Sequence, residues 1–304
     1  MSIKTSRTSE KARVKIDFSQ CSDCGLCSVV CKDLTLTMKN GKIQIDVNPV
    51  FGCVGCAQCV AVCPEDCIEI DGRTIVMDDF VPLTEFKTAA DYKGLYSLMF
   101  KRRSTRDFKN KEIEQEIIDK IMLAASTSPM GIPPSDVEVV IFNGKEKVKA
   151  FSTDFLNYLE SIKWMFSRWS MPFWKPFISK EDYEMFKSFL IPLINFLVER
   201  NKKGEDWLLY NAPLAMYFYG SPYADPADPY IPATYAMLAA ETLGLGTCMI
   251  GSIHPFLKGK RAEVLKKKYK INPKNKQGIF VIMGYPKVKY HKGIKRTFAK
   301  VVNI

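Results

Sequence analysis

Polar and apolar residues alternate in two short stretches near the N-terminus, and this alternation predicts two β-hairpins. Asn40-Gly41 interrupts one stretch and Asp71-Gly72 the other, and both dipeptides favour tight hairpin turns. The predicted strands are residues 34–38 and 42–47 in the first hairpin, and residues 67–70 and 74–77 in the second. A cysteine-rich loop precedes each hairpin, so residues 1–80 read as an internal repeat of two similar halves.

Beyond residue 91 the apolar residues recur mainly with helical spacing. In residues 113–125, for example, Ile117, Ile118, Ile121 and Met122 fall on one face of a helix. The predicted elements are helices over 92–101, 113–125 and 230–246 and strands over 137–142, 247–252 and 278–284. We therefore predict an α+β chain with two domains, residues 1–80 and 92–304, joined by a linker over residues 81–91.

The composition is that of a folded protein, with 47% hydrophobic and 25% charged residues among 304. The N-terminus is polar and basic and has no apolar core for a signal peptide. The longest apolar run, residues 189–198, contains Pro192 and Asn195 and is too short to span a bilayer. We expect a cytoplasmic protein without a transmembrane segment.

The formal net charge of +11 is unevenly distributed. Residues 1–80 hold nine Lys/Arg and eleven Asp/Glu, a net of −2, so the remaining chain carries +13. A basic surface suits nucleic acid, an anionic membrane, an acidic protein or a phosphorylated cofactor. Lysines such as Lys266, Lys267 and Lys268 are most simply a solvated helix face, and no nucleic-acid-binding motif accompanies them. We expect no nucleic-acid partner.

Nine of the ten cysteines lie between residues 21 and 67. Disulfides suit small secreted domains, and no secretion signal is present, so we favour metal ligation in a reducing compartment. The cysteines form two C-x2-C-x2-C-x3-C runs, Cys21, Cys24, Cys27 and Cys31, and then Cys53, Cys56, Cys59 and Cys63. Structural zinc uses four ligands in two pairs, which these tight quartets do not provide.

Two [4Fe–4S] clusters account for this spacing, because three close cysteines wrap one cube while the fourth reaches the neighbouring cube. The predicted ligand sets are Cys21, Cys24, Cys27 and Cys63 for one cluster, and Cys53, Cys56, Cys59 and Cys31 for the other. Gly25, Gly52 and Gly55 allow the tight turns that aim amides at sulfur. Over residues 13–79 the chain resembles the bacterial two-cluster ferredoxins. Cys67 is interpreted as a small buried thiol.

The string RRSTRDF at residues 102–108 follows a predicted helix and suits an anion, because guanidinium groups bind phosphate oxygens in a fork. A solvated basic turn is the alternative. The string resembles the Arg-x-Ser-x-(Arg/Lys)-x-Phe segment of the nitroreductase family, which holds the phosphate and ribityl chain of FMN. This resemblance implies FMN contacts from Arg102, Ser104 and Arg106, with Arg103 contributing through its backbone or side chain.

Three later segments extend the resemblance over residues 92–302. The loop Ser128 to Pro134 matches a loop that lies against the flavin ring, but it lacks the family's usual Asn and Gln-Pro-Trp, so backbone atoms around Pro129, Met130 and Gly131 would replace that contact. Gly251 matches the turn that approaches flavin N5. Lys295 and Arg296 match a basic pair that returns to the phosphate. The Gly-x-Gly at residues 244–246 follows a helix rather than a strand, so we reject a Rossmann site.

The family resemblance implies a central, mostly antiparallel sheet flanked by helices, with FMN at a homodimer interface. An aromatic-rich insertion at about residues 151–205 has no counterpart, and Pro172 and Pro176 divide it. Three interpretations remain open for it: a core or dimer interface, a lid over the flavin, or a membrane-surface attachment. Only two histidines exist, and His254 is a possible proton donor, whereas Cys248 is more simply a packed small residue.

Clusters carry single electrons and flavin can release a pair as hydride, so we predict an oxidoreductase in which electrons pass from the clusters to FMN and then to a substrate. The expected donor is reduced ferredoxin or a similar carrier, with NAD(P)H also open, and the acceptor is a small electrophile such as a nitro compound. We identify no catalytic side chain. The alternatives are a pathway-specific flavin reductase, acting in dehalogenation or double-bond reduction, and an electron-transfer partner without its own substrate.

Overall fold

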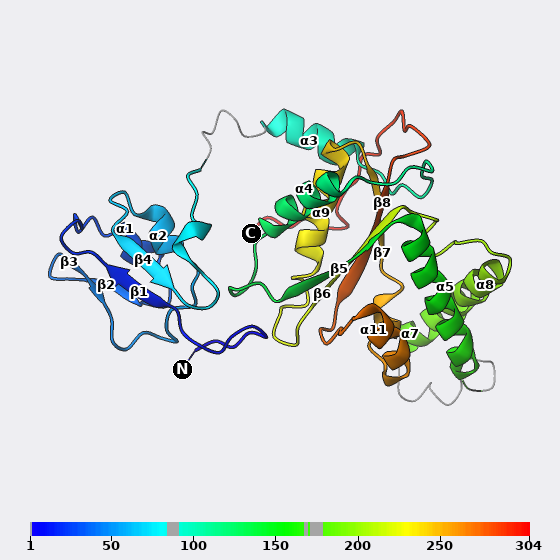
Figure 1. The fold of residues 1–304 in the computed structure, drawn as a ribbon, viewed down its shortest axis with the longest axis horizontal. Coiled ribbons are helices and arrows are strands. Elements are labelled where there is room, and N and C mark those ends of the chain that lie inside the picture. The colour runs from blue at the N-terminus through cyan, green and yellow to red at the C-terminus, as the bar shows by residue number, and fades with distance from the viewer. Residues whose placement is uncertain (1, 84–90, 167–169, 171–178) are drawn as a thin grey trace.

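The computed structural model describes residues 2–83, 91–166, 170 and 179–304. Its N-terminal module is a small body of two-stranded sheets and short helices (Figure 1). Its elements are β1 (Arg13–Ile16), α1 (Leu26–Val30), β2 (Leu36–Lys39), β3 (Lys42–Ile45), α2 (Gln58–Val62), β4 (Ile68–Asp71) and the 3-10 turn η1 (Met77–Asp79). Leu36, Ile43 and Ile68 pack with Cys27, Cys59 and Cys67 into its core. The cysteine loops therefore contribute Cys27 and Cys59 to the hydrophobic core, whereas Cys24 and Cys56 are exposed.

The structure confirms the first predicted hairpin, since β2 and β3 pair antiparallel on either side of Asn40-Gly41. The second predicted hairpin is wrong. Strand β4 pairs antiparallel with β1, and the only contact across the Asp71-Gly72 turn is a single bridge between Gly72 and Ile75. Arg73 and Thr74 adopt positive φ values of 53° and 68°, so the chain curls away instead of returning as a strand.

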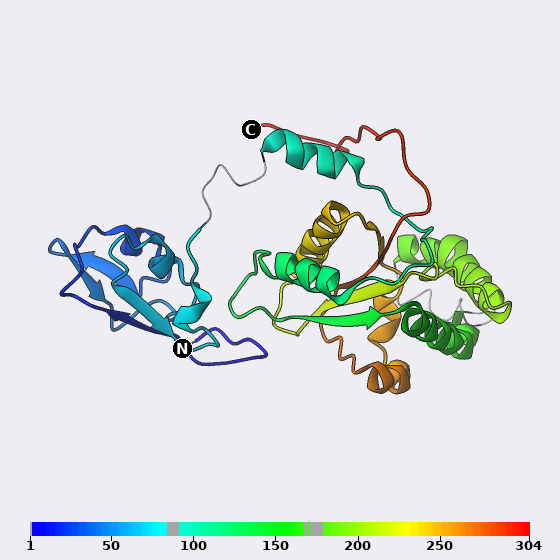
Figure 2. The same ribbon diagram turned by 45° about the horizontal axis from the view of Figure 1, so that its top comes forward.

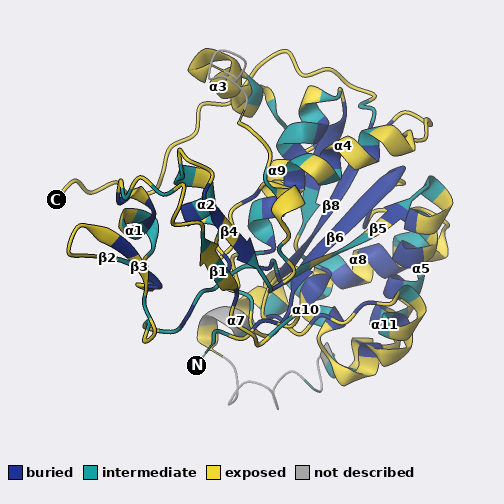
Figure 3. Ribbon diagram, turned by 60° about the vertical axis from the view of Figure 1, so that its left-hand side comes forward, coloured by how far each residue is buried: buried dark blue, intermediate teal, exposed yellow. Residues whose placement is uncertain are grey.

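The second domain contains a four-stranded antiparallel sheet of order β5-β6-β8-β7. Its strands are β5 (Val137–Asn143), β6 (Leu214–Gly220), β7 (Gly246–Ile250) and β8 (Gly278–Gly284). Every residue of the two central strands, β6 and β8, is buried, as Figure 3 shows by its colouring. This burial explains their continuous apolar sequences, and the architecture is the expected α+β sheet flanked by helices.

Helices cover both faces of this sheet (Figure 1). One face packs on α4 and α9 through Ile118, Ile121 and Ala236. The other face packs on α5 and α8 through Phe151, Phe155 and other residues. The helices of the domain are α3 (Tyr92–Lys101), α4 (Gln115–Ser126), α5 (Lys145–Ile162), α7 (Lys180–Met185), α8 (Ile191–Lys202), α9 (Tyr230–Thr242), α10 (His254–Leu257) and α11 (Glu263–Tyr269), with 3-10 turns η3 (Lys163–Phe166) and η6 (Lys260–Ala262) and the π-helical turn η5 (Phe186–Leu190).

The C-terminal tail after β8 turns back along α3, as Figure 2 shows. A Cβ atom at Gly293 would overlap the ring of Phe100 on that helix, so the tail lies directly against it. Helix α3 ends at Lys101, just before the RRSTRDF string begins, so the tail at Gly293 passes close to the start of that string. The fold thus brings the basic C-terminal tail near the RRSTRDF string.

Candidate redox centres

Two cavities in the N-terminal module are lined by cysteines from both sequence runs. One is lined by Cys21, Cys24, Cys27 and Cys63 of the two runs, and also by Cys67 and by apolar residues such as Ile16 and Ile68. The other is lined by Cys53, Cys56, Cys59 and Cys31, together with Leu36 and Ile70. Each cavity therefore collects three cysteines from one run and the fourth from the other, which is the partition expected for two [4Fe–4S] clusters.

The backbone around the cysteines turns as the glycines allow. Gly25, Gly52 and Gly55 have φ values of 80°, 83° and 69°, which side-chain-bearing residues rarely adopt. The amide of Leu36 donates to Sγ of Cys31 at 3.4 Å. Amides aimed at sulfur stabilise the additional negative charge of a reduced cluster, so this donor set fits an iron–sulfur group.

Burial controls the acidity of the deeper cysteines. It raises the pKa of Cys53 to about 11, with the amide of Gly55 opposing that change. It raises the pKa of Cys59 to about 12. Thiols with such values hold their protons near neutral pH, so iron must displace protons when it binds. No three His, Cys, Asp or Glu side chains in the described ranges converge as a single metal ion would require.

The RRSTRDF string lies along the outer edge of β7. Ser104 bridges to Thr247 in parallel, and the amide of Thr105 donates to the Thr247 carbonyl at 2.9 Å. A Cβ atom at Gly246 would lie 2.5 Å from Oγ1 of Thr105, so the glycine permits this close approach. The predicted phosphate-binding string is thereby fixed against the sheet rather than left in solvent.

One of the three arginines in the string has an unmatched donor. Nη1 of Arg102 is buried, and no hydrogen-bond partner for it lies among the described residues. Its charge acts on Glu241: burial raises the pKa of that carboxyl, and the positive charge of Arg102 opposes this rise. A buried guanidinium nitrogen with a free hydrogen fits an anionic ligand such as a phosphate. Arg103 instead lies over the ring of Tyr290 at 5.8 Å.

A cavity of about 720 Å³ opens at the end of β7. Arg106 and Gly251 line it together with the side chains of Trp207 and Tyr210. The guanidinium of Arg106 lies 5.7 Å from the centre of the Tyr210 ring. A Cβ atom at Gly251 would meet only Cδ1 of Ile279, at 3.8 Å, so a side chain here would project into the open space. The residues present therefore fit a planar group lying over the Gly251 turn.

The aromatic insertion contributes to both the core and this cavity. Phe151 and Phe155 are fully buried on α5, which supports the core interpretation for that part. The second part, on α7, η5 and α8, forms a wall of the Gly251 cavity through Met185, Phe186, Phe189, Leu190, Leu193 and Leu197. Trp169, Phe173, Trp174 and Phe177, and the predicted breaks at Pro172 and Pro176, lie outside the described residues.

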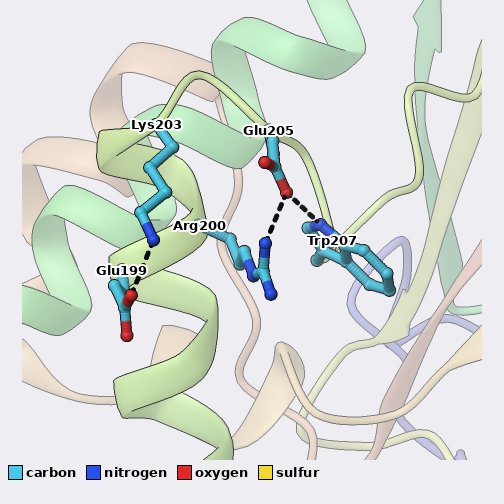
Figure 4. Close-up of polar contacts among 5 residues, drawn as sticks. All are labelled: Glu199, Arg200, Lys203, Glu205 and Trp207. Atoms are coloured by element: carbon cyan, nitrogen blue, oxygen red, sulfur yellow. Dashed lines mark hydrogen bonds and ion pairs between the residues drawn. The ribbon is translucent and has the colours of Figure 1, made fainter.

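Trp207 is held in the cavity wall by a network that sequence reasoning missed (Figure 4). Its Nε1 donates to Glu205 at 2.7 Å, and the same carboxylate oxygen pairs with Arg200 at 3.3 Å. Phe196 packs edge-on against the indole at 5.4 Å between ring centres. Glu205 follows Gly204, whose φ of 78° turns the chain off the end of α8. The sequence signal for this network was the order Gly-Glu-x-Trp at residues 204–207, which places the carboxylate two residues before the indole.

The remaining predicted FMN residues lie elsewhere in the chain. Pro129 and Met130 line a separate cavity on the face of the sheet covered by α4 and α9. Their loop leads into β5, and two strands separate β5 from β7, which is about 14 Å at the usual strand spacing. Gly131 lies near Asp228 rather than Gly251. Lys295 and Arg296 are exposed in the tail. One chain therefore does not bring all ten predicted FMN contacts to one point.

His254 and Cys248 are structural residues. His254 is 2% exposed, its Nδ1 lies 2.7 Å from the hydroxyl of Tyr217, and its Nε2 lies 3.2 Å from the carbonyl of Lys276. Burial lowers the pKa of His254, so the ring stays neutral. It does not line the Gly251 cavity. Cys248 is buried, and Cys67 packs 3.5 Å from Sγ of Cys63.

Comparison with known proteins matches two separate parts of the chain. The profile of the nitroreductase family matches residues 99–285, and the profile of the 4Fe-4S dicluster domain matches residues 13–64. A "Ferredoxin-like protein in nif region" of Bradyrhizobium diazoefficiens is 34% identical over 71 residues, which are 22% of this chain and 88% of that protein.

Among solved structures, a nitroreductase with bound FMN from Desulfitobacterium hafniense is 22% identical, with a TM-score of 0.49, over 69% of this chain and 97% of that one. A nitroreductase with bound FMN from Bacteroides fragilis is 16% identical, with the same TM-score and coverage.

The chain is therefore an oxidoreductase that carries a ferredoxin-type 4Fe–4S domain before its catalytic domain. It belongs to the nitroreductase family. No helix in the described part of the chain is long and apolar enough to cross a membrane.

Proposed function

We propose that this chain takes electrons from a low-potential carrier such as reduced ferredoxin, passes them through two [4Fe–4S] clusters to FMN, and delivers them to a small electrophilic acceptor. The observation that carries the proposal is the sorting of eight cysteines into two cavity-lining quartets within one nitroreductase-family chain. Unpaired cysteines in this number persist most readily where thiols are kept reduced, which supports a cytoplasmic location.

The clusters would supply single electrons, and FMN would collect two of them and release them together as a hydride. The chain's own residues hold and shape these groups. Arg102 is placed to bind the phosphate through its unpaired Nη1, and Ser104 and Arg106 extend along β7 toward the cavity. The open turn at Gly251 leaves its backbone accessible to the flavin ring.

The FMN site is proposed to be shared between two copies of the chain. Arg106 and Gly251 lie at one edge of the sheet, whereas Pro129 and Met130 lie on the opposite edge and the opposite face. A single flavin touching both groups needs the loop from a second chain. This separation supports a homodimer in which each FMN is bound by residues of both copies.

The acceptor is proposed to be an apolar ring compound with a reducible group, such as a nitro or quinone-like compound. The cavity beside Gly251 is walled mainly by apolar side chains, including Phe189, Leu193 and Trp207, and Arg106 is its only charged residue among those described. Aromatic walls stack on planar ligands, and one arginine stabilises negative charge as the ligand is reduced.

Anaerobic turnover tests this proposal with reduced methyl viologen as donor and nitrobenzene or menadione as acceptor. We expect viologen oxidation that depends on the acceptor. In Phe189→Ala the KM for these acceptors should rise about tenfold, because a stacked aromatic contact is lost. Phe18→Ala is the matched control, since both rings are 59% exposed but Phe18 lies in the N-terminal module.

Failure on every nitroaromatic and quinone, in protein that contains both kinds of cofactor, would refute these acceptors. Turnover of a halogenated or unsaturated compound instead would favour the pathway-specific flavin reductase. An equal KM change in the Phe189 and Phe18 variants would refute the assignment of the cavity.

A further inference from the structure

Arg73, in the N-terminal module, is a buried arginine with no carboxylate in salt-bridge contact among the described residues. Its side chain is 2% exposed, and its donors go to main-chain carbonyls and one hydroxyl. Nε and Nη2 both donate to the carbonyl of Pro133 in the second domain, at 3.1 and 2.7 Å. Nη1 donates to the carbonyls of Ile3 and Glu10 at 2.9 and 2.6 Å, and to Oγ of Ser2 at 3.3 Å. One guanidinium thus joins the N-terminal segment, the module and the second domain.

A second contact connects the same two parts from the other side. Asp136, at the entrance to β5, is 8% exposed. Its carboxylate accepts the amide of Ser6 at 2.9 Å and the hydroxyl of Ser6 at 2.7 Å. It also accepts the hydroxyl of Ser221, at the end of β6, at 2.7 Å. The junction therefore consists of a buried cation from the module and a buried anion from the second domain, each with several hydrogen bonds.

Arg73 also lies against one of the two cysteine loops. A Cβ atom built on Gly55 would lie 3.7 Å from Cβ of Arg73 and 3.5 Å from Cβ of Ala12. The amide of Ala12 donates to the carbonyl of Cys53 at 2.9 Å. Arg73 is held there with a φ of 53°, which is costly for an arginine and persists only where the surroundings require it. The cavity lined by Cys53, Cys56, Cys59 and Cys31 is therefore the one next to the junction.

The other side of the junction leads to the proposed flavin-facing loop. Pro133 is two residues from Gly131, and Ser135 lines the same cavity as Pro129 and Met130. The carbonyl of Ser135 is a further acceptor, from Arg7 at 3.4 Å. A path of packed and hydrogen-bonded backbone thus runs from the Cys53 loop through Arg73 to the loop before β5.

We propose that the cluster held by Cys53, Cys56, Cys59 and Cys31 is the exit cluster of the N-terminal module, and that Arg73 is the positioning residue that docks it against the loop before β5. This inference rests on the proposed function. When bound, the cluster would supply one electron at a time, so two electrons from the external donor and two protons from water would be needed to reduce one FMN. Since the proposed flavin lies across the dimer, the acceptor is the FMN that contacts this loop.

Arg73 has a second consequence for the exit cluster. A cluster gains one negative charge when it is reduced, and a nearby positive charge held away from solvent stabilises that state. Loss of the Arg73 charge should therefore make the midpoint potential of one cluster more negative and leave the other cluster unchanged. The Cys21 cavity, which contains no residue of the junction, should hold the unaffected cluster.

The test is freeze-quench EPR of the full-length protein loaded with iron and FMN and mixed anaerobically with reduced methyl viologen. In the wild type the reduced-cluster signal should appear and then decay as FMN absorbance bleaches. In Arg73→Gln the decay should slow roughly tenfold to a hundredfold, because the docked arrangement then loses the equivalent of one hydrogen bond to a charged group. Arg73→Lys should restore the potential of the affected cluster but only part of the transfer rate.

Two further variants keep the test independent of folding at Arg73. Asp136→Asn breaks the junction from the second domain and should slow the decay without moving either cluster potential; it should also increase hydrogen exchange of the Ser6 amide. Arg13→Gln, which removes an exposed arginine paired with Asp71 at 2.8 Å in the same module, is the matched control and should behave as wild type.

Wild-type decay in both Arg73→Gln and Asp136→Asn, at full iron and FMN content, would overturn the inference while leaving the proposed function intact. A shift of both cluster potentials by Arg73→Gln, or of neither, would overturn the assignment of the exit cluster. If reduced clusters in the wild type never reduce FMN, the proposed function fails and this inference fails with it.

Discussion

Replacement of Arg102 by glutamine tests the proposed phosphate site. Arg102 is chosen because its Nη1 is buried and lacks a partner among the described residues, whereas Arg103 and Arg106 already lie over tyrosine rings. A hydrogen bond to a charged group contributes about 1.5–3 kcal/mol, so loss of one such bond to phosphate should raise the Kd for FMN roughly 10- to 150-fold.

Riboflavin isolates the phosphate contribution because it lacks that group. We expect Arg102→Gln to weaken FMN binding, measured by quenching of flavin fluorescence, and to leave riboflavin binding within about twofold of the wild type. Lys101→Gln is the matched control, since it removes the same charge one residue earlier from an exposed side chain. Arg102→Gln should also raise the pKa of Glu241 further, because the charge of Arg102 opposes the effect of burial on that carboxyl.

An equal loss of FMN and riboflavin affinity in Arg102→Gln would refute the phosphate assignment, because it would indicate damage to the ring site or to the fold. An equal loss of FMN affinity in Lys101→Gln would show that the phosphate responds to the overall positive charge and not to a hydrogen bond from Arg102.

Three other expectations concern the scaffold. Burial lowers the pKa of His254, so below about pH 6.5 the unfolded chain binds a proton that the folded chain does not. The free energy of unfolding should therefore fall on acidification, by up to about 1.4 kcal/mol per pH unit more in the wild type than in His254→Gln. Urea unfolding at pH 7.5 and 5.5 measures this difference. Gly246→Ala should destabilise the second domain by about 1–3 kcal/mol in thermal unfolding, since its Cβ would clash with Thr105. Iron analysis should show loss of one cluster in Cys56→Ser and full iron in Cys67→Ser, and the reverse result would overturn the ligand assignment.

The cysteine module was largely predictable because its chemistry depends on local spacing. The quartets, the glycine turns and the Asn40-Gly41 hairpin are all encoded within a few residues of one another. The pairing of β1 with β4 was not predictable in this way, since it joins Arg13 to Asp71 across the whole module. A turn signal such as Asp71-Gly72 specifies where the chain reverses, but the partner of β4 depends on the apolar surface available elsewhere.

The flavin half was predictable only in outline. The basic string and Gly251 could be read from short motifs, and they lie along the same edge strand. The distance between that edge and the loop of Pro129 depends on strand order, which no local pattern contains. The Arg73 junction was missed because its guanidinium donates to main-chain carbonyls, including that of Pro133 in the other domain. The Trp207 network was missed although its partners are near in sequence, because ordinary surface residue types form it and no motif marks them.

The most direct test of the account is an anaerobic EPR and optical spectrum of the purified, dithionite-reduced protein, with iron and flavin measured on the same sample. We predict about eight irons and one FMN per chain, and EPR signals of two interacting [4Fe–4S] clusters. Zinc in place of iron, or a protein that binds no flavin after incubation with FMN, would contradict the central claim that two clusters and one flavin work in a single chain.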